Sequence, residues 1–118
     1  MRLDHIQLAI PEGSEDKCRL FWQGLLGFSE IEKPKALQAR GGIWFRCDTV
    51  EIHLGVEKEF RPAAKAHPAF SVSNIDETAQ NLASHGWSVD WDEAILGRRR
   101  FFTKDAVGNR VEFLQGNL

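Results

Sequence analysis

The stretch His67-Pro-Ala-Phe-Ser-Val72 decides the fold, because it repeats His5-Ile-Gln-Leu-Ala-Ile10 near the start of the chain. Both stretches begin with a histidine and continue with apolar residues two positions apart, which is the alternation of a β-strand. Each leads into an acidic, helix-like segment, and each half closes on Val-Glu followed by an apolar residue. A repeat of this length indicates one supersecondary unit that the chain uses twice.

The two halves have the same predicted order of elements, which is strand, helix and three further strands. Helices are expected at residues 14–26, with Ser14 as N-cap, and 75–85, with Asn74 or Ser73 as N-cap; residues 33–40 are expected to form a loop. The predicted strands lie at residues 3–10, 28–32, 42–48 and 50–56, and at residues 67–72, 88–91, 99–104 and 109–115.

Four strands with one helix on one face leave the other face of each sheet open. The predicted fold class is therefore α+β, with two paired βαβββ modules that form a half-open barrel and carry their helices outside. We expect one domain over residues 1–118, with module one at 1–57, a linker at 58–66 and module two at 67–118.

Composition excludes several classes of protein. The chain has 118 residues, of which 27% are charged and 42% hydrophobic, and its net charge is −2, so nothing indicates nucleic-acid or membrane binding. Its apolar stretches are too short to span a bilayer. Cys18 and Cys47 are isolated and indicate reduced thiols in a cytoplasmic protein.

Strand alternation predicts which side chains share the open faces. The apolar residues of the strand at 50–56 belong with the helix, so Glu51 points to the other face. The same count places Glu112, His5 and His67 on open faces. The repeat therefore predicts two pairs, His5 with Glu51 and His67 with Glu112.

Two imidazoles and two carboxylates suit a divalent ion such as Zn²⁺, Ni²⁺, Fe²⁺, Mn²⁺ or Co²⁺. With positions left open for water, such a site is a Lewis acid rather than a structural clip. His53 shares the face of Glu51 and is a rival or additional ligand. Taken singly, each of these residues is more often structural or solvated, but their recurrence at matching positions favours a site.

Seven stretches, spread over nearly the whole chain, match in order the motifs of a known superfamily: Leu3-Asp-His-Ile-Gln-Leu8, Phe21-Trp-Gln-Gly-Leu-Leu-Gly-Phe28, Trp44-Phe-Arg46, Glu51-Ile-His-Leu54, His67-Pro-Ala-Phe-Ser-Val72, Arg100-Phe-Phe-Thr-Lys-Asp105 and Gly108-Asn-Arg-Val-Glu-Phe113. The sequence resembles the vicinal oxygen chelate superfamily, which includes glyoxalase I, extradiol dioxygenases, fosfomycin-resistance enzymes and bleomycin-resistance proteins. The resemblance implies the paired βαβββ fold. It also implies metal ligands at His5, His67 and Glu112, with Glu51 as the fourth.

The resemblance further implies a divalent-metal-dependent, glyoxalase-like enzyme of the lyase or isomerase type. Its metal would chelate two neighbouring oxygens of a small substrate and stabilise an enediolate or similar oxyanion, while Glu112 or Glu51 moves a proton between adjacent carbons. A lactoylglutathione lyase assignment rests on kinship alone. The chain has no tyrosine, so fosfomycin transferases and extradiol dioxygenases, which rely on tyrosines near their metals, fit poorly. It also has Ala106 where the family commonly has proline, a departure that affects turn geometry more than chemistry.

The alternative is a metal-free protein that binds a small molecule or drug, as bleomycin-resistance proteins do. That hypothesis expects apolar residues at the ligand positions. Because the chain has histidine and glutamate there, a metal is favoured. We expect a small-molecule substrate, no nucleic-acid or membrane partner, and a homodimer.

Six further side chains are expected to contact the substrate: His53, Gln7, Arg46, Arg100, Trp44 and Phe102. Either Arg99 or Arg100 would bind a substrate carboxylate or phosphate, the alternative being an ion pair with Asp92 or Glu93. In each of the aromatic pairs Trp44-Phe45 and Phe101-Phe102, one ring is expected in the core and the other on the open face.

Overall fold

The computed structural model describes residues 1–117. The chain divides into two compact units, Met1–Pro62 and Ala63–Leu118, and the division falls within the segment expected to be a linker. Each unit contains a strand, a helix and three further strands in that order. The predicted α+β class with two βαβββ modules is therefore confirmed, while the assignment of both modules to a single domain stays a prediction.

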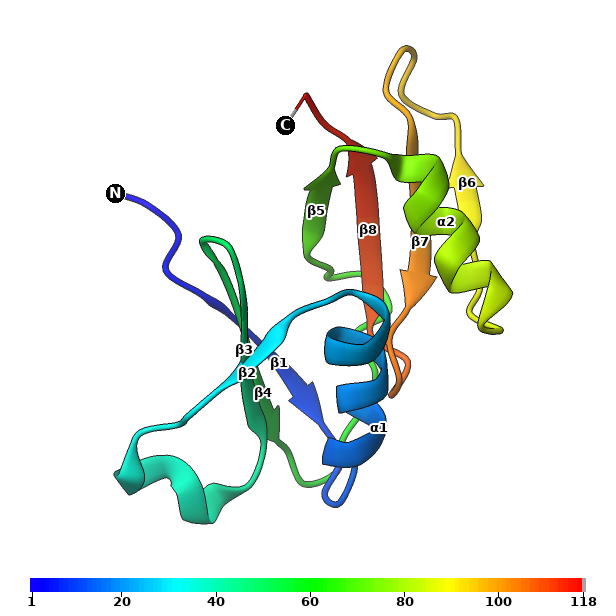
Figure 1. Cartoon of the computed structure of the whole chain (residues 1–118). Coiled ribbons are helices and arrows are strands. Elements are labelled where there is room, and N and C mark those ends of the chain that lie inside the picture. Colours follow the sequence, from blue (N-terminus) through cyan, green and yellow to red (C-terminus); the bar gives the residue numbers. More distant parts are fainter. Residues whose placement is uncertain (118) are drawn as a thin grey trace. The chain divides into compact units, whose positions relative to one another are not determined.

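The first unit contains a mixed four-stranded sheet in the order β1-β4-β3-β2 (Figure 1). Strand β1 pairs in parallel with β4, and the other neighbours are antiparallel. The elements are β1 (Ile6–Ile10), helix α1 (Glu15–Arg19), the π-helical segment η1 (Leu20–Leu25), β2 (Ser29–Ile31), the 3-10 helix η2 (Lys35–Arg40), β3 (Ile43–Cys47) and β4 (Val50–Val56).

The predicted helix at residues 14–26 is present as two consecutive segments, α1 and η1. In the second segment the N–H of Leu26 donates to the carbonyl of Phe21, five residues back, as in a π-helix. Phe21 and Trp22 are both fully buried and meet edge to face with ring centroids 5.1 Å apart. The wider turn thus places two adjacent large rings in the core.

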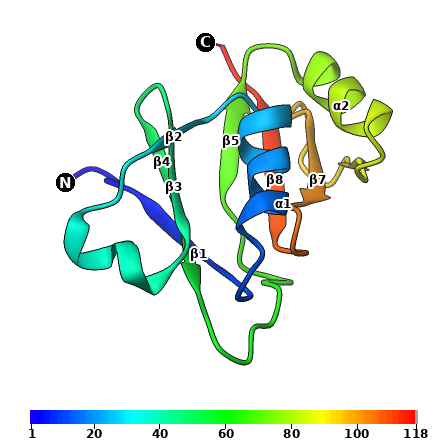
Figure 2. The same ribbon diagram turned by 60° about the horizontal axis from the view of Figure 1, so that its bottom comes forward.

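One local prediction in this unit is confirmed in position only, and another is wrong. Ser14 stands at the N-cap position, but its hydroxyl donates to the carbonyl of Pro11 at 2.6 Å and does not cap the helix. Residues 33–40 are not a plain loop, because they contain η2, seen as the cyan coil in Figure 2. Pro34 precedes η2, and its carbonyl accepts the N–H of Leu37 at 2.8 Å, which starts the 3-10 turn.

The second unit repeats the topology of the first, with sheet order β5-β8-β7-β6 and β5 parallel to β8. Helix α2 lies against this sheet (Figure 1) and contacts β8. The elements are β5 (Ala69–Val72), α2 (Ile75–Ser84), β6 (Asp90–Asp92), β7 (Arg100–Lys104) and β8 (Arg110–Gln115).

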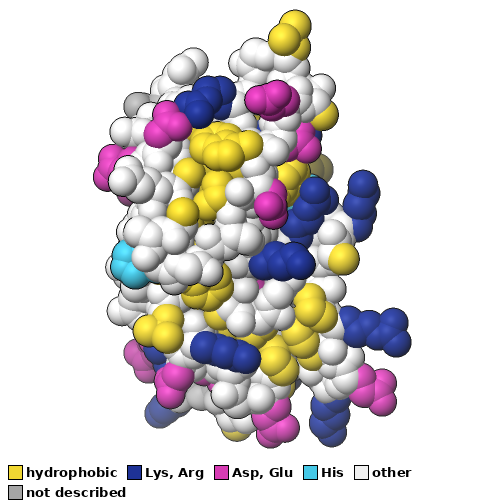
Figure 3. Space-filling view, turned by 90° about the vertical axis from the view of Figure 1, so that its right-hand side faces the viewer, with side chains coloured by type: hydrophobic (Ala, Val, Ile, Leu, Met, Phe, Trp, Pro, Cys, Tyr) yellow, Lys and Arg dark blue, Asp and Glu magenta, His cyan; other side chains and the backbone are white. Residues whose placement is uncertain are grey.

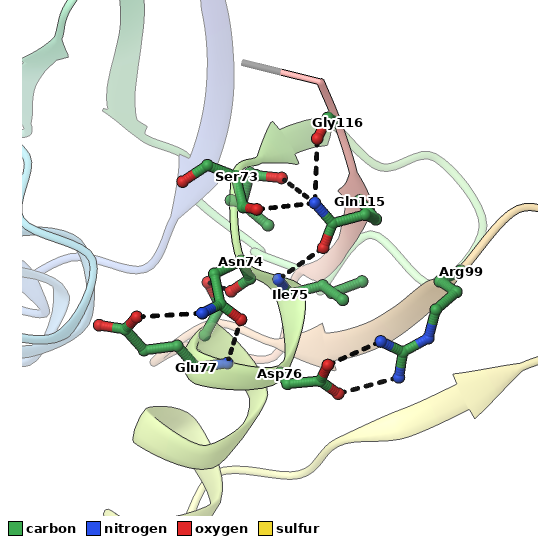
Figure 4. A network of polar contacts seen from close by, with 10 residues as sticks. Ser73, Asn74, Ile75, Asp76, Glu77, Arg99, Gln115 and Gly116 are labelled. Carbon is green, nitrogen blue, oxygen red and sulfur yellow. Dashed lines mark hydrogen bonds and ion pairs between the residues drawn. The ribbon is translucent and has the colours of Figure 1, made fainter.

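Polar contacts join the first turn of α2 to the sheet (Figure 4). Asn74 is the N-cap, and its side-chain oxygen accepts the N–H of Glu77 at 3.1 Å. Gln115, the last residue of β8, accepts the N–H of Ile75 at 3.0 Å. The contact also shows that the Gln115 side chain lies on the helix side of the sheet.

Each sheet has one apolar, buried face. In the first unit Phe45 is fully buried, whereas the neighbouring Trp44 is only partly buried and lies on the other face. In the second unit Phe101 is fully buried and stacks on Phe113 at 5.2 Å. Phe102 contacts polar groups on the opposite face. The alternation predicted for both aromatic pairs is confirmed.

The surface is charged with both signs. Figure 3 shows a face on which Lys and Arg, Asp and Glu, and apolar side chains are interspersed. Within residues 1–117 no helix has the length and apolar composition needed to cross a membrane.

Candidate functional site

The site in the second unit is built around His67 and Glu112. The N–H of Glu112 donates to the carbonyl of Pro68 at 3.0 Å, so β8 lies beside the segment that precedes β5. This pairing places Nε2 of His67 2.9 Å from Oε1 of Glu112, although the two residues are 45 positions apart. Glu112 is only 5% exposed. The predicted pairing of His67 with Glu112 is therefore confirmed as a contact.

Arg100 contacts the other oxygen of the same carboxylate. Its Nη1 lies 3.3 Å from Oε2 of Glu112, and its Nη2 lies 3.1 Å from Oδ1 of Asp92. The N–H of Ala94 and the guanidinium of Arg100 together hold the pKa of Asp92 below its ordinary value. Arg100 thus makes an ion pair with Asp92, as the alternative interpretation of this arginine expected.

Phe102 forms the apolar centre of this site. The ring of His67 meets it edge-on with centroids 5.2 Å apart. The guanidinium of Arg110 lies over the ring at 3.9 Å, and that of Arg100 lies at 5.2 Å. Phe102 therefore fixes an imidazole and two cations on one face of the sheet.

The site in the first unit is a stack of three rings. Trp44 and His53 are paired across β3 and β4, and their rings are nearly parallel at 3.7 Å. His5 stacks on the other side of His53 at 4.0 Å. His53 is 4% exposed, so the outer histidine is the accessible member of the stack.

Glu51 lies beside this stack. Its Oε1 contacts Nε2 of His53 at 3.0 Å, and its Oε2 accepts from Nη2 of Arg46 at 2.9 Å. His53 and then Arg46 lower the pKa of Glu51, so this carboxylate stays ionised at neutral pH. The hydrogen bond of Glu51 goes to His53, the residue expected as a rival or additional ligand, while Nδ1 of His5 lies 2.9 Å from Oδ2 of Asp4. The pairing of His5 with Glu51 as ligands of one ion stays a prediction. Counting along the strand could not decide which of two imidazoles on one face reaches the carboxylate.

Gln7, another predicted contact residue, lies over a glycine of the neighbouring strand. A Cβ at Gly55 would come within 2.6 Å of Nε2 of Gln7. The glycine therefore gives the Gln7 amide room on the open face of the sheet.

The two candidate ligand histidines are oriented alike. Nδ1 of His67 lies 2.9 Å from the carbonyl oxygen of Lys65, and Nδ1 of His5 lies 2.9 Å from the carboxylate of Asp4. An acceptor at Nδ1 favours the tautomer that carries its proton there and places the lone pair on Nε2, the nitrogen that would bind a metal. The sequence did not predict that Lys65 and Asp4 orient these two histidines.

Residues 1–117 contain no cluster of three or more His, Cys, Asp or Glu side chains of the kind that holds a metal by itself. The predicted ligands are divided between the units, with His5 and Glu51 in the first and His67 and Glu112 in the second. Their assembly into one site stays a prediction.

The fold and these motifs define a class of protein. The chain belongs to the Glyoxalase/Bleomycin resistance protein/Dioxygenase superfamily, whose family model matches residues 2–113. The resemblance inferred from the sequence is therefore confirmed.

Solved structures of this class share the fold. The chain is 45% identical to a glyoxalase family protein from Bacillus anthracis, with a TM-score of 0.94 over 99% of this chain and 96% of that one. A mutant of the fosfomycin resistance protein FosX from Listeria monocytogenes, complexed with Mn(II) and 1S,2S-dihydroxypropylphosphonic acid, is 20% identical, with a TM-score of 0.80 over 99% and 93% of the chains. TnmS3, an antibiotic binding protein from Streptomyces sp. CB03234, is 17% identical, with a TM-score of 0.74 over 99% of both chains. No protein of curated function gives a significant match.

Proposed function

We propose that the chain is a divalent-metal-dependent enzyme of the glyoxalase superfamily, of lyase or isomerase type, that acts on a small substrate with two neighbouring oxygens. The proposed ligands are His5, His67 and Glu112, with Glu51 as the fourth. Zn²⁺, Ni²⁺, Fe²⁺, Mn²⁺ and Co²⁺ all suit this set of nitrogen and oxygen donors. When bound, the ion would supply Lewis-acid polarisation of the substrate oxygens.

The contacts of His67 carry this proposal. Its Nδ1 faces the carbonyl of Lys65, and its Nε2 faces Oε1 of Glu112, both at 2.9 Å. A neutral imidazole donates from one nitrogen and has a lone pair on the other, so it cannot satisfy two acceptors. Both contacts are favourable only when each ring nitrogen carries a proton or when a cation lies beside Nε2 and Oε1. The pair is thus arranged to hold a positive charge.

The two glutamates provide different environments for proton transfer. Glu51 is held ionised by His53 and Arg46, which fits a ligand or an acceptor of a substrate proton. Glu112 is almost fully buried and presents Oε1 to His67 while Arg100 occupies the region of Oε2. We assign proton movement between adjacent substrate carbons to one of these carboxylates.

Elemental analysis of the full chain, purified without a chelator, tests the proposal. We expect one divalent ion per chain in the wild type and loss of that ion in His67→Gln and Glu112→Gln. His85→Gln is the matched control, because His85 is an exposed histidine of the same unit whose Nδ1 contacts Asn81. A wild type without metal after exposure to all five ions would reject the proposal.

A second candidate function is supported by the carboxylate contacts. Protein groups already contact both oxygens of Glu51 and of Glu112, and the stack of Trp44, His53 and His5 presents a ring face. These features also fit a metal-free protein that binds a planar small molecule. Metal-free wild type that binds such a ligand, with weaker binding in Trp44→Ala, would favour this function.

The cytoplasmic location and the homodimer stay proposals. Cys47 is a free thiol, which agrees with a reducing compartment. Sedimentation of the purified chain at several concentrations measures whether it forms the expected dimer.

A further inference from the structure

Arg110 is a cation of the second unit that the proposed chemistry does not use. It begins β8, is partly buried, and holds its guanidinium 3.9 Å over the ring of Phe102. Within residues 1–117 it makes no direct ion pair, although its charge contributes to the lowered pKa of Asp92. The carboxylates of its own sheet face, Glu112 and Asp92, are in contact with other groups. A guanidinium that lies over a ring keeps its N–H groups for hydrogen bonds to another acceptor.

The neighbouring Arg99 and Arg100 already form ion pairs with carboxylates. Arg100 donates through Nη1 to Glu112 and through Nη2 to Asp92, and its Nε is buried without a hydrogen-bond partner in the described chain. Arg99 makes a bidentate ion pair with Asp76 on the helix side of the sheet, at 2.7 and 2.9 Å. Arg110 is therefore the guanidinium of these three that remains available to a ligand.

Arg110 also lies close to Glu112, one of the proposed metal ligands. It and Glu112 are two residues apart on β8 and share one face, so their Cα atoms are about 7 Å apart. This spacing suits a compact molecule that reaches Glu112 with one end and Arg110 with the other.

We infer that Arg110 binds an oxyanion of the substrate, a carboxylate or a phosphonate, in a bidentate contact over Phe102. The inference rests on the proposed function for the identity of the reacting end. It goes beyond that function by assigning the substrate class, which is a small anion. Arg110, rather than Arg99 or Arg100, is then the residue that selects the charged substrate.

The test is an NMR titration of the full chain, dialysed against a chelator, with acetate, methylphosphonate and the neutral acetamide. The side-chain Nε–H resonances of the arginines report which guanidinium binds. The variants are Arg110→Gln, which loses the charge, and Arg110→Lys, which keeps the charge but loses the planar fork. Arg98→Gln is the control, because Arg98 is exposed, belongs to the same unit and gives the same change in charge.

We expect an anion to shift the Arg110 resonance in the wild type and in Arg98→Gln, with no effect of acetamide. Binding should weaken about tenfold in Arg110→Gln, the loss expected for one charge-assisted contact, and by a smaller factor in Arg110→Lys. The tighter of the two anions identifies the group. No anion binding to the wild type, or equal binding by Arg110→Gln, would overturn the inference. Because the titration omits metal, either result leaves the metal proposal to be judged by elemental analysis.

Discussion

Nε2 of His67 lies 2.9 Å from Oε1 of the buried Glu112, and the parallel pairing of β5 with β8 creates this contact. Glu112→Ala would leave Arg100, whose side chain is 16% exposed, with Asp92 as its remaining carboxylate partner. Breaking a buried charge pair typically costs about 3 kcal/mol. Urea unfolding of the metal-free chain should show a loss of that size. A loss as small as that of the exposed-site variant His85→Ala would contradict the burial of this pair.

The pKa of Glu51 should rise when either partner is removed. Hydrogen bonds from His53 and Arg46 hold it below its ordinary value of 4.5. The stability that this ionised carboxylate contributes is present above its unfolded pKa and is lost as pH falls through its folded pKa. Carboxyl NMR titration of Arg46→Gln should give a higher pKa for Glu51 than the wild type, and His53→Gln should do the same. An unchanged value in both variants would show that these contacts are absent in solution.

Phe101 and Trp91 are paired across β7 and β6 and are in contact, but only Phe101 is fully buried, whereas Trp91 is 45% exposed. Phe101→Ala creates a cavity and should lower the free energy of unfolding by about 4 kcal/mol. Trp91→Ala should cost clearly less, because water already reaches that ring. Equal losses for the two variants, measured by denaturant unfolding, would contradict the difference in burial between Phe101 on the inner strand β7 and Trp91 on the edge strand β6.

Alanine substitutions at Gly42 and Gly97 distinguish the cost of backbone strain from the cost of a steric clash. Both have positive φ, 84° and 74°, and a Cβ at Gly97 would meet nothing within 4 Å. A Cβ at Gly42 would overlap the carbonyl oxygen of Leu54 in the neighbouring strand. Gly97→Ala should therefore cost about 1 kcal/mol, from the left-handed backbone alone. Gly42→Ala should cost markedly more, and a thermal unfolding midpoint equal to that of Gly97→Ala would be evidence against the close approach of these strands.

The sequence predicted the fold because its evidence is periodic. Alternation along β4 and β8 correctly placed Glu51 with His53 and put Glu112 on the open face, since the side-chain period of a strand is fixed. The repeat predicted that both units have the same topology. Neither the alternation nor the repeat requires knowledge of which side chains are in contact.

Contacts between side chains were harder to predict. Stacking of Trp44 on His53 depends on the register of β3 with β4, which a single sequence does not specify. Ser14 suits an N-cap, but its hydroxyl has an equally local alternative in the Pro11 carbonyl. Arg110 was not among the predicted site residues, because alternation gives its face but not the ring it covers or the partners of nearby arginines.

The proposed metal site has four ligands, His5, His67, Glu112 and Glu51, on one divalent ion. A crystal structure of the full chain loaded with Zn²⁺, with data collected at the zinc absorption edge, measures this directly. We expect one anomalous peak about 2.1 Å from Nε2 of both His5 and His67, with Glu112 and Glu51 oxygens at about the same distance. A loaded chain in which the ion binds elsewhere, or in which no ion contacts His67 and Glu112, would contradict it.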